Sequence, residues 1–300
     1  MENATDVLKW LLLSKEWDRS NSVCLSLWGI SGCVSLLLQH AQINEKETMS
    51  LSTTRCTNPV LRPVVLKEDF GNVVHMTDIL FEVQERDNLI FGLGSKVHFK
   101  GHWRTGFDQQ GGCRCVFRTS PPGYKHWIMV QAMTSVEDKH TSTLVTEDLQ
   151  HFRVLHLPYC GGDAYMHILI PKRGQDGDVF QLLKLVPDLT HYFDIKAAKQ
   201  AAGYTLLLPK WRTESEQTLN ETMELLNVPL CGLDWVTQHC VVEVQENDLL
   251  FRDKKLQLPC SRSRQNMDYI VDQPFIYVIT TAGKKSRIML FVGAVKDPRP

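Results

Sequence analysis

The chain has 300 residues, with 33 lysines and arginines against 34 aspartates and glutamates, and its formal net charge is −1. This balance, without a long run of like charges, argues against a nucleic-acid or polyanion partner. A chain of this length buries roughly three-quarters of the surface that its unfolded form exposes. We therefore expect residues 1–300 to form a single monomeric domain that needs no disulfide bonds for stability.

The first forty residues predict two helices and no membrane span. The apolar run at 8–13 follows acidic Glu2 and Asp6, and it is too short to cross a bilayer. Residues 23–25 should be an extended stretch between the two helices. Since no signal peptide is recognisable, we expect a reducing compartment. Two glycosylation sequons keep an extracellular location open, and they begin at Asn3 and Asn220.

The cysteines favour free thiols over a metal site or disulfides. There are nine, at 24, 33, 56, 113, 115, 160, 231, 240 and 260. An odd number cannot pair completely within the chain. Cys113 and Cys115 are the only close pair, and zinc fingers need a second set of ligands beyond the first. We expect neither a metal nor a cofactor.

The second half of the chain predicts sheet strands. Residues 42–88 are polar, and 73–83 within them have a mixed period that assigns no element. Strands are expected at 241–246, 269–279 and 286–295, where β-branched and aromatic residues alternate or run together. A polar segment, 247–268, lies between the first two of these strands.

Several short motifs in this chain resemble those of the serpins, and they occur in that family's order. The segments are His98–Trp103 (HFKGHW), Leu155–Gly161 (LHLPYCG) with Met166–Pro171 (MHILIP), Leu208–Ser215 (LPKWRTES), Asp272–Phe275 (DQPF) and Phe291–Pro298 (FVGAVKDP). Each motif alone is weak, but five in order across about two-thirds of the chain identify a shortened, divergent member.

The resemblance implies an α+β fold with mainly antiparallel sheets and N-terminal helices. Between the second helix and the strand at Phe91 the chain has too few residues for the helices of a full serpin, so that region should be reduced. A second shortening lies between Pro229 and Val241. The main sheet is then exposed on one side, unless residues 49–83 form a substitute cover.

The resemblance also implies a mechanical trap rather than an enzyme. A protease that attacks the reactive loop forms an acyl-enzyme and is displaced as the cut loop enters the main sheet as a new strand. The hinge of this loop matches Glu246, Asn247, Asp248, Leu249 and Leu250, with Asp248 where the family usually has glycine. No nucleophile elbow, zinc-binding helix motif or dinucleotide-binding loop occurs in the sequence.

Charged residues after the hinge argue against insertion. In the family's register Leu249, Phe251, Asp253 and Lys255 would face the core, because alternate residues of a strand point to opposite faces. A shift by one residue would instead bury the charged side chains of Asp248, Arg252 and Lys254. Either register places at least two charges under the sheet, and an unpaired buried ion costs several kcal/mol.

The loop keeps the full length of a protease bait. Its bounds, Glu246 and Pro274, are 28 positions apart (274 − 246). Arg262-Ser263 and Arg264 lie near the expected scissile position, so trypsin-like proteases would be the attackers. Arginines are also common in any solvated loop, and that alternative stays open.

The positions that control sheet opening in the family, called the shutter, are only partly kept. Ser26 matches the family's serine under the sheet, whereas Ser95 replaces an asparagine and Gln238, followed by His239, replaces a histidine. Since serine and glutamine still hydrogen-bond, the contact should remain satisfied but lose its switch. Trp103 keeps the aromatic residue where loop insertion begins, although a tryptophan at the edge of a core explains it equally well.

These observations favour a non-inhibitory or weakly inhibitory serpin that binds a protein. Short serpins without a signal peptide resemble those of poxviruses, which would imply host-defence modulation in the host cytoplasm. The alternative is an active inhibitor of an Arg-specific serine protease with Arg262 as bait, and a cleavable decoy lies between the two. We expect a protein partner, with serine proteases as candidates, and neither nucleic acid nor membrane.

Overall fold

The described part of the chain is mostly β-strand. The structure, a computed structural model, describes residues 22–27, 29–30, 73–85, 88–104, 107, 113–119, 126–135, 144–146, 150–162, 164–172, 179, 184–185, 190–195, 198–200, 205–225, 230, 233–246, 269–281 and 289–299. For 73–85, 88–91, 144, 190–191, 200 and 225 it describes only the backbone. The predicted N-terminal helices lie outside these residues, apart from a few positions at 27–30.

The main sheet has four strands in the order β11-β12-β3-β2. Its strands are β2 (Val73–Glu85), β3 (Asn88–Lys100), β11 (Trp211–Thr218) and β12 (Trp235–Val244). Buried and exposed residues alternate along β11 and most of β12, as in a strand with one face on a core. Residues 73–83, which the sequence left unassigned, belong to β2, and the strand predicted at 241–246 is the end of the longer β12.

A seven-stranded sheet has the order β1-β15-β14-β8-β7-β6-β9. Its strands are β1 (Ser22–Ser26), β6 (Leu144–Thr146), β7 (Phe152–Pro158), β8 (Ala164–Pro171), β9 (Lys199–Gln200), β14 (Phe275–Thr281) and β15 (Met289–Val295). The central strands β8, β14 and β15 are apolar over almost their whole length, because both of their faces are buried. The extended stretch predicted at 23–25 is confirmed as part of β1.

A smaller four-stranded sheet has the order β13-β10-β5-β4. Its strands are β4 (Arg114–Arg118), β5 (Trp127–Thr134), β10 (Leu206–Pro209) and β13 (Tyr269–Ile270). The single strand predicted at 269–279 is therefore wrong, because β13 and β14 belong to different sheets. Pro274 stands just before β14, and a proline cannot donate to a sheet ladder.

Two short helices complete the described elements, the 3-10 helix η3 (Thr190–Phe193) and the α-helix α4 (Asn220–Leu225). α4 follows Leu219 directly in the chain. Leu219 and Met223, four residues apart and so on one face, are both fully buried. The Asn220 side chain accepts a hydrogen bond from the backbone N–H of Val236, at 2.8 Å, which ties the start of α4 to β12.

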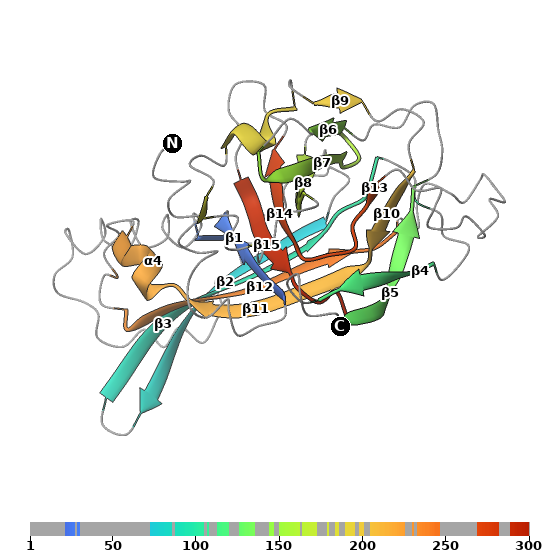
Figure 1. Cartoon of the computed structure of the whole chain (residues 1–300). Coiled ribbons are helices and arrows are strands. Elements are labelled where there is room, and N and C mark those ends of the chain that lie inside the picture. Colours follow the sequence, from blue (N-terminus) through green and yellow to red (C-terminus); the bar gives the residue numbers. More distant parts are fainter. Residues whose placement is uncertain are drawn as a thin grey trace.

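The predicted shortening of the fold is visible where β2 meets β3. Only two residues connect these strands, so no helix stands between them in the chain. The strands pair antiparallel from Val73 with Lys100 to Glu85 with Asn88, whereas β12 pairs with β3 only from Gly92 onward. The closed end of this hairpin therefore extends past the rest of the sheet, as Figure 1 shows. The fold is mostly sheet with few helices, as predicted.

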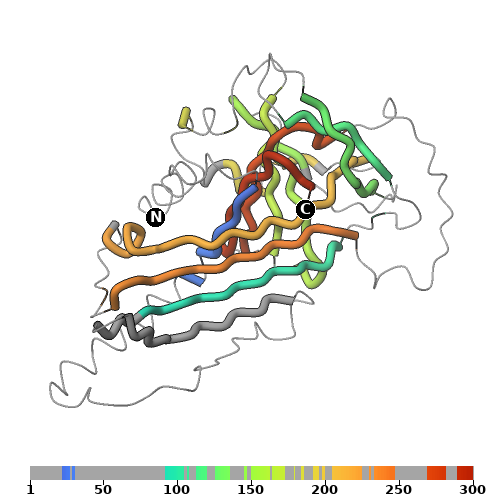
Figure 2. The backbone as a smooth tube through the Cα atoms, turned by 90° about the horizontal axis from the view of Figure 1, so that it is seen from below, coloured from blue at the N-terminus to red at the C-terminus, as the bar shows by residue number. Residues whose placement is uncertain are grey.

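The core lies between the main sheet and the other two sheets. β1, β14 and β15 cross over one face of the main sheet in Figure 1, and Figure 2 shows β11, β12 and β3 lying side by side beneath them. Large aromatic side chains fill the space between, among them Phe99, Tyr277 and Phe291, each at most 1% exposed. No described helix is long and apolar enough to cross a membrane.

Candidate functional site

The candidate site is the boundary between β3 and β12, which we call the seam. Nine residue pairs join the two strands, from Trp235 with Gly92 to Glu243 with Lys100. This pairing is parallel, whereas β11 with β12 and β2 with β3 pair antiparallel. Any strand that entered the sheet here would first have to separate these nine pairs.

The inner face of the seam is apolar. Val97 and Phe99 on β3 and Val242 and Val244 on β12 are 0–2% exposed. The Phe99 ring lies 5.2 Å from the ring of Tyr159 and 5.1 Å from the ring of Phe291, measured between centroids. This side of the seam is a packed core with no charged side chain among these residues.

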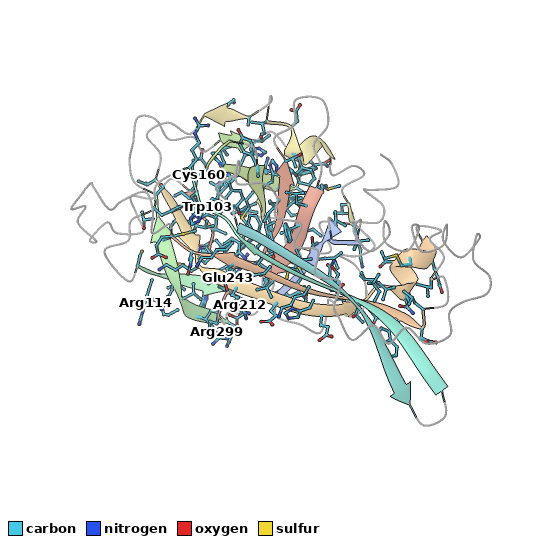
Figure 3. All side chains as sticks on the ribbon, turned by 180° about the vertical axis from the view of Figure 1, so that it is seen from behind. Trp103, Arg114, Cys160, Arg212, Glu243 and Arg299 are labelled. Carbon is cyan, nitrogen blue, oxygen red and sulfur yellow. The ribbon has the colours of Figure 1, made fainter. Side chains whose placement is uncertain are left out.

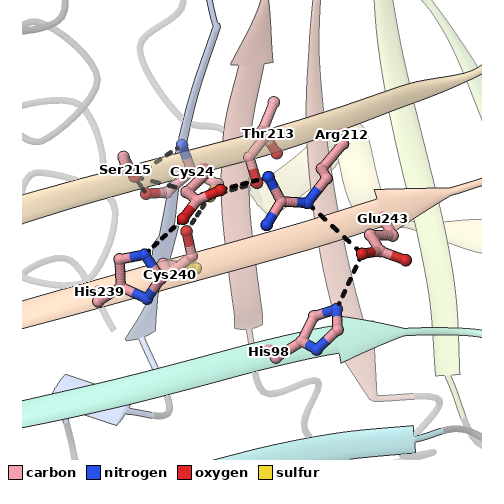
Figure 4. A network of polar contacts seen from close by, with 9 residues as sticks. Cys24, His98, Arg212, Thr213, Ser215, His239, Cys240 and Glu243 are labelled. Atoms are coloured by element: carbon pink, nitrogen blue, oxygen red, sulfur yellow. Dashed lines mark hydrogen bonds and ion pairs between the residues drawn. The ribbon is translucent and has the colours of Figure 1, made fainter. Parts of the chain in front are cut away.

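The outer face of the seam carries a charged cluster centred on Glu243. Its carboxylate lies 3.4 Å from His98 Nε2 and 4.0 Å from Lys100 Nζ, both on β3, and 3.5 Å from Arg212 Nε on β11. Figure 4 shows Glu243 between His98 and Arg212. The Glu243 side chain is 27% exposed, so water screens these pairs only in part. They link three strands and cross the seam.

The cluster continues along β11 and β12. Arg212 forms an ion pair with Glu214, whose other carboxylate oxygen accepts a 2.8 Å hydrogen bond from His239. The hydrogen bond from His239 lowers the pKa of the Glu214 carboxyl, and Arg212 acts in the same direction. His239, predicted beside Gln238 at the shutter, therefore faces outward and does not join the shutter contact.

The shutter contact itself joins Ser26 on β1 to Gln238 on β12. The Gln238 amide accepts from the Ser26 N–H at 2.8 Å and donates to the Ser26 carbonyl at 3.0 Å. Ser26 Oγ donates to the carbonyl of Leu290 at 3.3 Å. The side chains of Ser26 and Gln238 thus have hydrogen-bond partners, as expected.

Ser95 is brought to the same place but is not satisfied. It is the register partner of Gln238 and is 2% exposed, yet its hydroxyl has no hydrogen-bond partner among the described residues. The expectation of a fully satisfied shutter is therefore wrong at Ser95. The two hydrogen bonds between Ser26 and Gln238 therefore connect β12 to β1 without Ser95 of β3.

Gly29, which was not among the predicted shutter residues, packs against Ser26 and Gln238. A Cβ atom at this position would lie 2.6 Å from Gln238 Nε2 and 2.8 Å from a methyl group of Val97. Its N–H donates to Ser26 Oγ at 3.0 Å. A glycine at position 29 thus leaves the room that the Gln238 side chain occupies.

Trp103 lies where β12 leads into the segment 247–268. Its indole N–H donates to the carbonyl of Gln245 at 3.0 Å, and its ring stacks on Tyr159 with centroids 4.5 Å apart. The Cys160 thiol donates to the backbone carbonyl of Trp103 at 3.1 Å, and Figure 3 shows Cys160 and Trp103 next to each other. The tryptophan is 1% exposed and anchors the end of β12.

Tyr159 and Cys160 belong to the turn between β7 and β8. Gly161 and Gly162 follow with φ of 86° and 74°, which side chains with a Cβ rarely adopt. This turn presents Tyr159 to Trp103.

The hinge is described only at its first residue. The Glu246 carboxylate forms an ion pair with Lys210, which follows β10. The other predicted hinge residues, Asn247, Asp248, Leu249 and Leu250, lie outside the described residues, and so do the predicted bait residues Arg262, Ser263 and Arg264.

No group of three or more His, Cys, Asp or Glu side chains that could hold a metal ion occurs in the described part of the chain. The described cysteines Cys24, Cys113, Cys115, Cys160 and Cys240 are free thiols. The site is therefore described by its strand pairing, packing and polar contacts.

Comparisons with known proteins agree with this arrangement. The family model described as "Serpin (serine protease inhibitor)" matches residues 74–298. Serpin-Z10 of Arabidopsis thaliana is 22% identical over 257 residues, which are 75% of this chain and 63% of that protein. Plasminogen activator inhibitor 1 of Sus scrofa is 23% identical over 231 residues, 69% of this chain and 54% of that protein. The chain thus spans less than two-thirds of the length of these relatives.

Solved structures have the same fold. The mouse protein-Z dependent protease inhibitor superposes with a TM-score of 0.64 at 17% identity, covering 99% of this chain and 96% of the other. Native protease nexin-1, solved with heparin, gives a TM-score of 0.67 at 14% identity, covering 99% and 98%.

Proposed function

This chain belongs to the serpin family, and we propose that it is a member in which the trapping step is weak or lost and which acts by binding another protein. Its relatives are named as protease inhibitors rather than as catalytic enzymes. The question for this chain is therefore whether a cut loop enters the main sheet at the seam.

One observation carries the proposal: among the described residues, the inner face of the seam has no charged side chain that could pair with an inserted charge. An inserted strand would lie between β3 and β12, with alternate side chains among Val97, Phe99 and Val242, all at most 1% exposed. The family's register would direct Asp253 and Lys255 to this face.

Mutual pairing of Asp253 with Lys255 offsets only part of the cost of removing both charges from water, which is several kcal/mol per unpaired ion. The alternative register brings Asp248, Arg252 and Lys254 to the same apolar face. Both registers oppose insertion.

The contacts across the seam act in the same direction. Glu243 on β12 holds His98 and Lys100 of β3, and separating the strands breaks both ion pairs. A hydrogen bond from Ser95 of β3 does not offset this loss, because the Ser95 hydroxyl makes no hydrogen bond among the described residues. A closed sheet is therefore favoured before and after loop cleavage.

The partner is proposed to be a protein, with serine proteases as the first candidates because relatives are named as inhibitors of such enzymes. A role in host defence and a host cytoplasmic location stay predictions from the resemblance to poxvirus serpins. The relatives named above come from a plant and from mammals.

The second candidate is an active inhibitor of an Arg-specific protease with Arg262 as bait. Its support is the loop's full length between Glu246 and Pro274 and the preserved anchor between Trp103 and Gln245.

Incubation with trypsin at a near-stoichiometric ratio, followed by denaturing gel electrophoresis, separates the candidates. We expect the natural sequence to give an intact or clipped chain without a detergent-stable adduct. A clipped chain with cleavage mapped to Arg262 or Arg264 would indicate a decoy. An adduct would contradict the proposal and favour the second candidate.

Two double variants test the physical reason. Asp253→Ala with Lys255→Ala removes the charges that face the core in the family's register, and it should increase the fraction of adduct. Arg252→Ala with Lys254→Ala is the matched control, since it removes two charges that would face solvent in that register. Equal adduct from both variants would show that charge burial does not decide the outcome.

A further inference from the structure

Two buried cysteines meet where β1 passes under β12. Cys24 and Cys240 are both 0% exposed, although 216 positions separate them in the chain. The Cys24 thiol donates to the carbonyl oxygen of Cys240 at 3.1 Å. Figure 4 shows both residues together beneath the main sheet.

The backbone fixes this meeting from two sides. Ser215 on β11, the register partner of Cys240, accepts a hydrogen bond from the Cys24 N–H at 3.3 Å and donates to the Cys24 carbonyl. Two residues later on β1 and two residues earlier on β12, Ser26 bonds Gln238 through two hydrogen bonds. β1 and β12 are thus held at two successive levels, and at one of them the Cys24 thiol bonds the backbone of Cys240.

We propose that Cys24 and Cys240 form a redox modification site, in which a small-molecule disulfide oxidises the pair to an intramolecular disulfide bond. One cysteine attacks the small disulfide as thiolate, forms a mixed disulfide and releases one small thiol. The second cysteine then attacks the protein sulfur of the mixed disulfide and releases the other small thiol. The two protein thiols lose two electrons and two protons, and the small disulfide gains them.

The closed sheet keeps this site unreactive. The thiolate is the nucleophile in disulfide exchange. Burial raises the pKa of Cys240 well above its usual value. At Cys24 burial acts in the same direction, but the hydrogen bonds of the thiol outweigh it, so the pKa of Cys24 is lowered. The oxidant also cannot reach side chains that are 0% exposed. The reaction therefore requires a transient separation of β12 from β1, so its rate reports how often the main sheet lifts from the strands beneath it.

The bond would link the main sheet to the seven-stranded sheet, because β12 belongs to the first and β1 to the second. It would hold one side of the seam in place beside the Ser26–Gln238 contact. This inference concerns the thiols alone and does not depend on whether the protein traps a protease.

The test is oxidation of the full chain with oxidised glutathione, followed by intact mass measurement and peptide mapping without reduction. We expect a loss of the mass of two hydrogen atoms and a cross-linked peptide pair that contains Cys24 and Cys240, reversed by dithiothreitol. Warming below the unfolding transition should increase the rate, since it increases sheet opening. Because mapping uses the natural sequence, the result does not depend on whether a variant folds.

Three variants sharpen the assignment. Cys24→Ser and Cys240→Ser should each abolish the cross-link, and Cys115→Ser, at another buried free thiol, should leave its yield unchanged. A cross-link that maps to a different cysteine pair would overturn the proposal. So would glutathione adducts on Cys24 or Cys240 that never resolve into a protein disulfide.

Discussion

The two faces of the seam differ in their environment: the inner face is buried and the outer face is charged and partly exposed. On the inner face Val97, Phe99 and Val242 are removed from water, and they contact other apolar side chains. On the outer face, one residue along each strand, His98 Nε2 lies 3.4 Å from the Glu243 carboxylate, and both side chains remain partly exposed to solvent. Since side chains alternate along a strand, one pair of strands carries both environments.

An additional strand in the seam would have to match both faces. It would have to present apolar or small side chains inward and polar ones outward, in register with its neighbours. The segment after Glu246 has charges at four consecutive positions, 252–255, so no register keeps all of them on the outer face. This mismatch is the physical basis of the proposed loss of trapping.

The largest expected effect comes from the inner face. Phe99→Ala removes a ring that packs between Tyr159 and Phe291, and it should lower the free energy of unfolding by about 3–5 kcal/mol. Chemical denaturation measures this change. The control is Lys96→Ala on the exposed face of the same strand, which should shift stability by less than about 0.5 kcal/mol. Similar losses for both variants would contradict the assignment of faces.

A smaller loss is expected at the shutter. Gln238→Leu leaves the buried N–H and carbonyl of Ser26 without their partners, at a cost of about 1–3 kcal/mol. Thr237→Val, at the neighbouring position of β12, is the control and should have little effect. An unchanged unfolding midpoint for Gln238→Leu would mean that the two hydrogen bonds do not stabilise the sheet.

The outer face should contribute less. Glu243→Gln removes the charge that holds His98, Lys100 and Arg212, and the expected loss is up to about 1 kcal/mol because the group is partly exposed. Hydrogen exchange of the seam amides should accelerate, most clearly at low salt. Glu216→Gln on β11, away from the seam, serves as the control. Identical exchange in both variants would argue that the pairs do not hold the seam.

The smallest effect is a pH dependence at Glu214. Its pKa is lowered in the folded state, mainly by the hydrogen bond from His239, so its contribution is present above the unfolded pKa of about 4.3 and is lost as pH falls through the lower folded pKa. With the Glu214 side chain 42% exposed, the contribution is roughly 0.2–0.5 kcal/mol. Glu214→Gln should flatten the acid limb of the stability profile by that amount, and a steeper limb would contradict it.

Much of the fold was accessible from sequence because its motifs are local. The strand ends around Trp103 and the segment after Phe291 follow short patterns. The shortening before Phe91 follows from the resemblance, because the chain has fewer residues there than the helices of a full serpin need. The shutter was less accessible. That Gln238 needs Gly29, that the Ser95 hydroxyl has no hydrogen-bond partner among the described residues and that His239 faces outward all depend on distances between strands far apart in the sequence.

The split of 269–279 between two sheets was missed for a similar reason. A continuous apolar run predicts a strand but does not say which sheet it joins, and only the tertiary pairing places Tyr269 beside Leu206 and Phe275 beside Val295. The meeting of Cys24 with Cys240 likewise has no signature in their spacing.

The most direct test of the account is a thermal melt of the protein after cleavage of the loop near Arg262. Loop insertion adds a central strand to the main sheet and stabilises the cut chain, whereas a loop that stays outside leaves the sheet as it was. We predict that cut and intact protein melt at the same temperature. A cut protein that melts far above the intact one would show that the charged segment enters the seam, and would contradict the central claim.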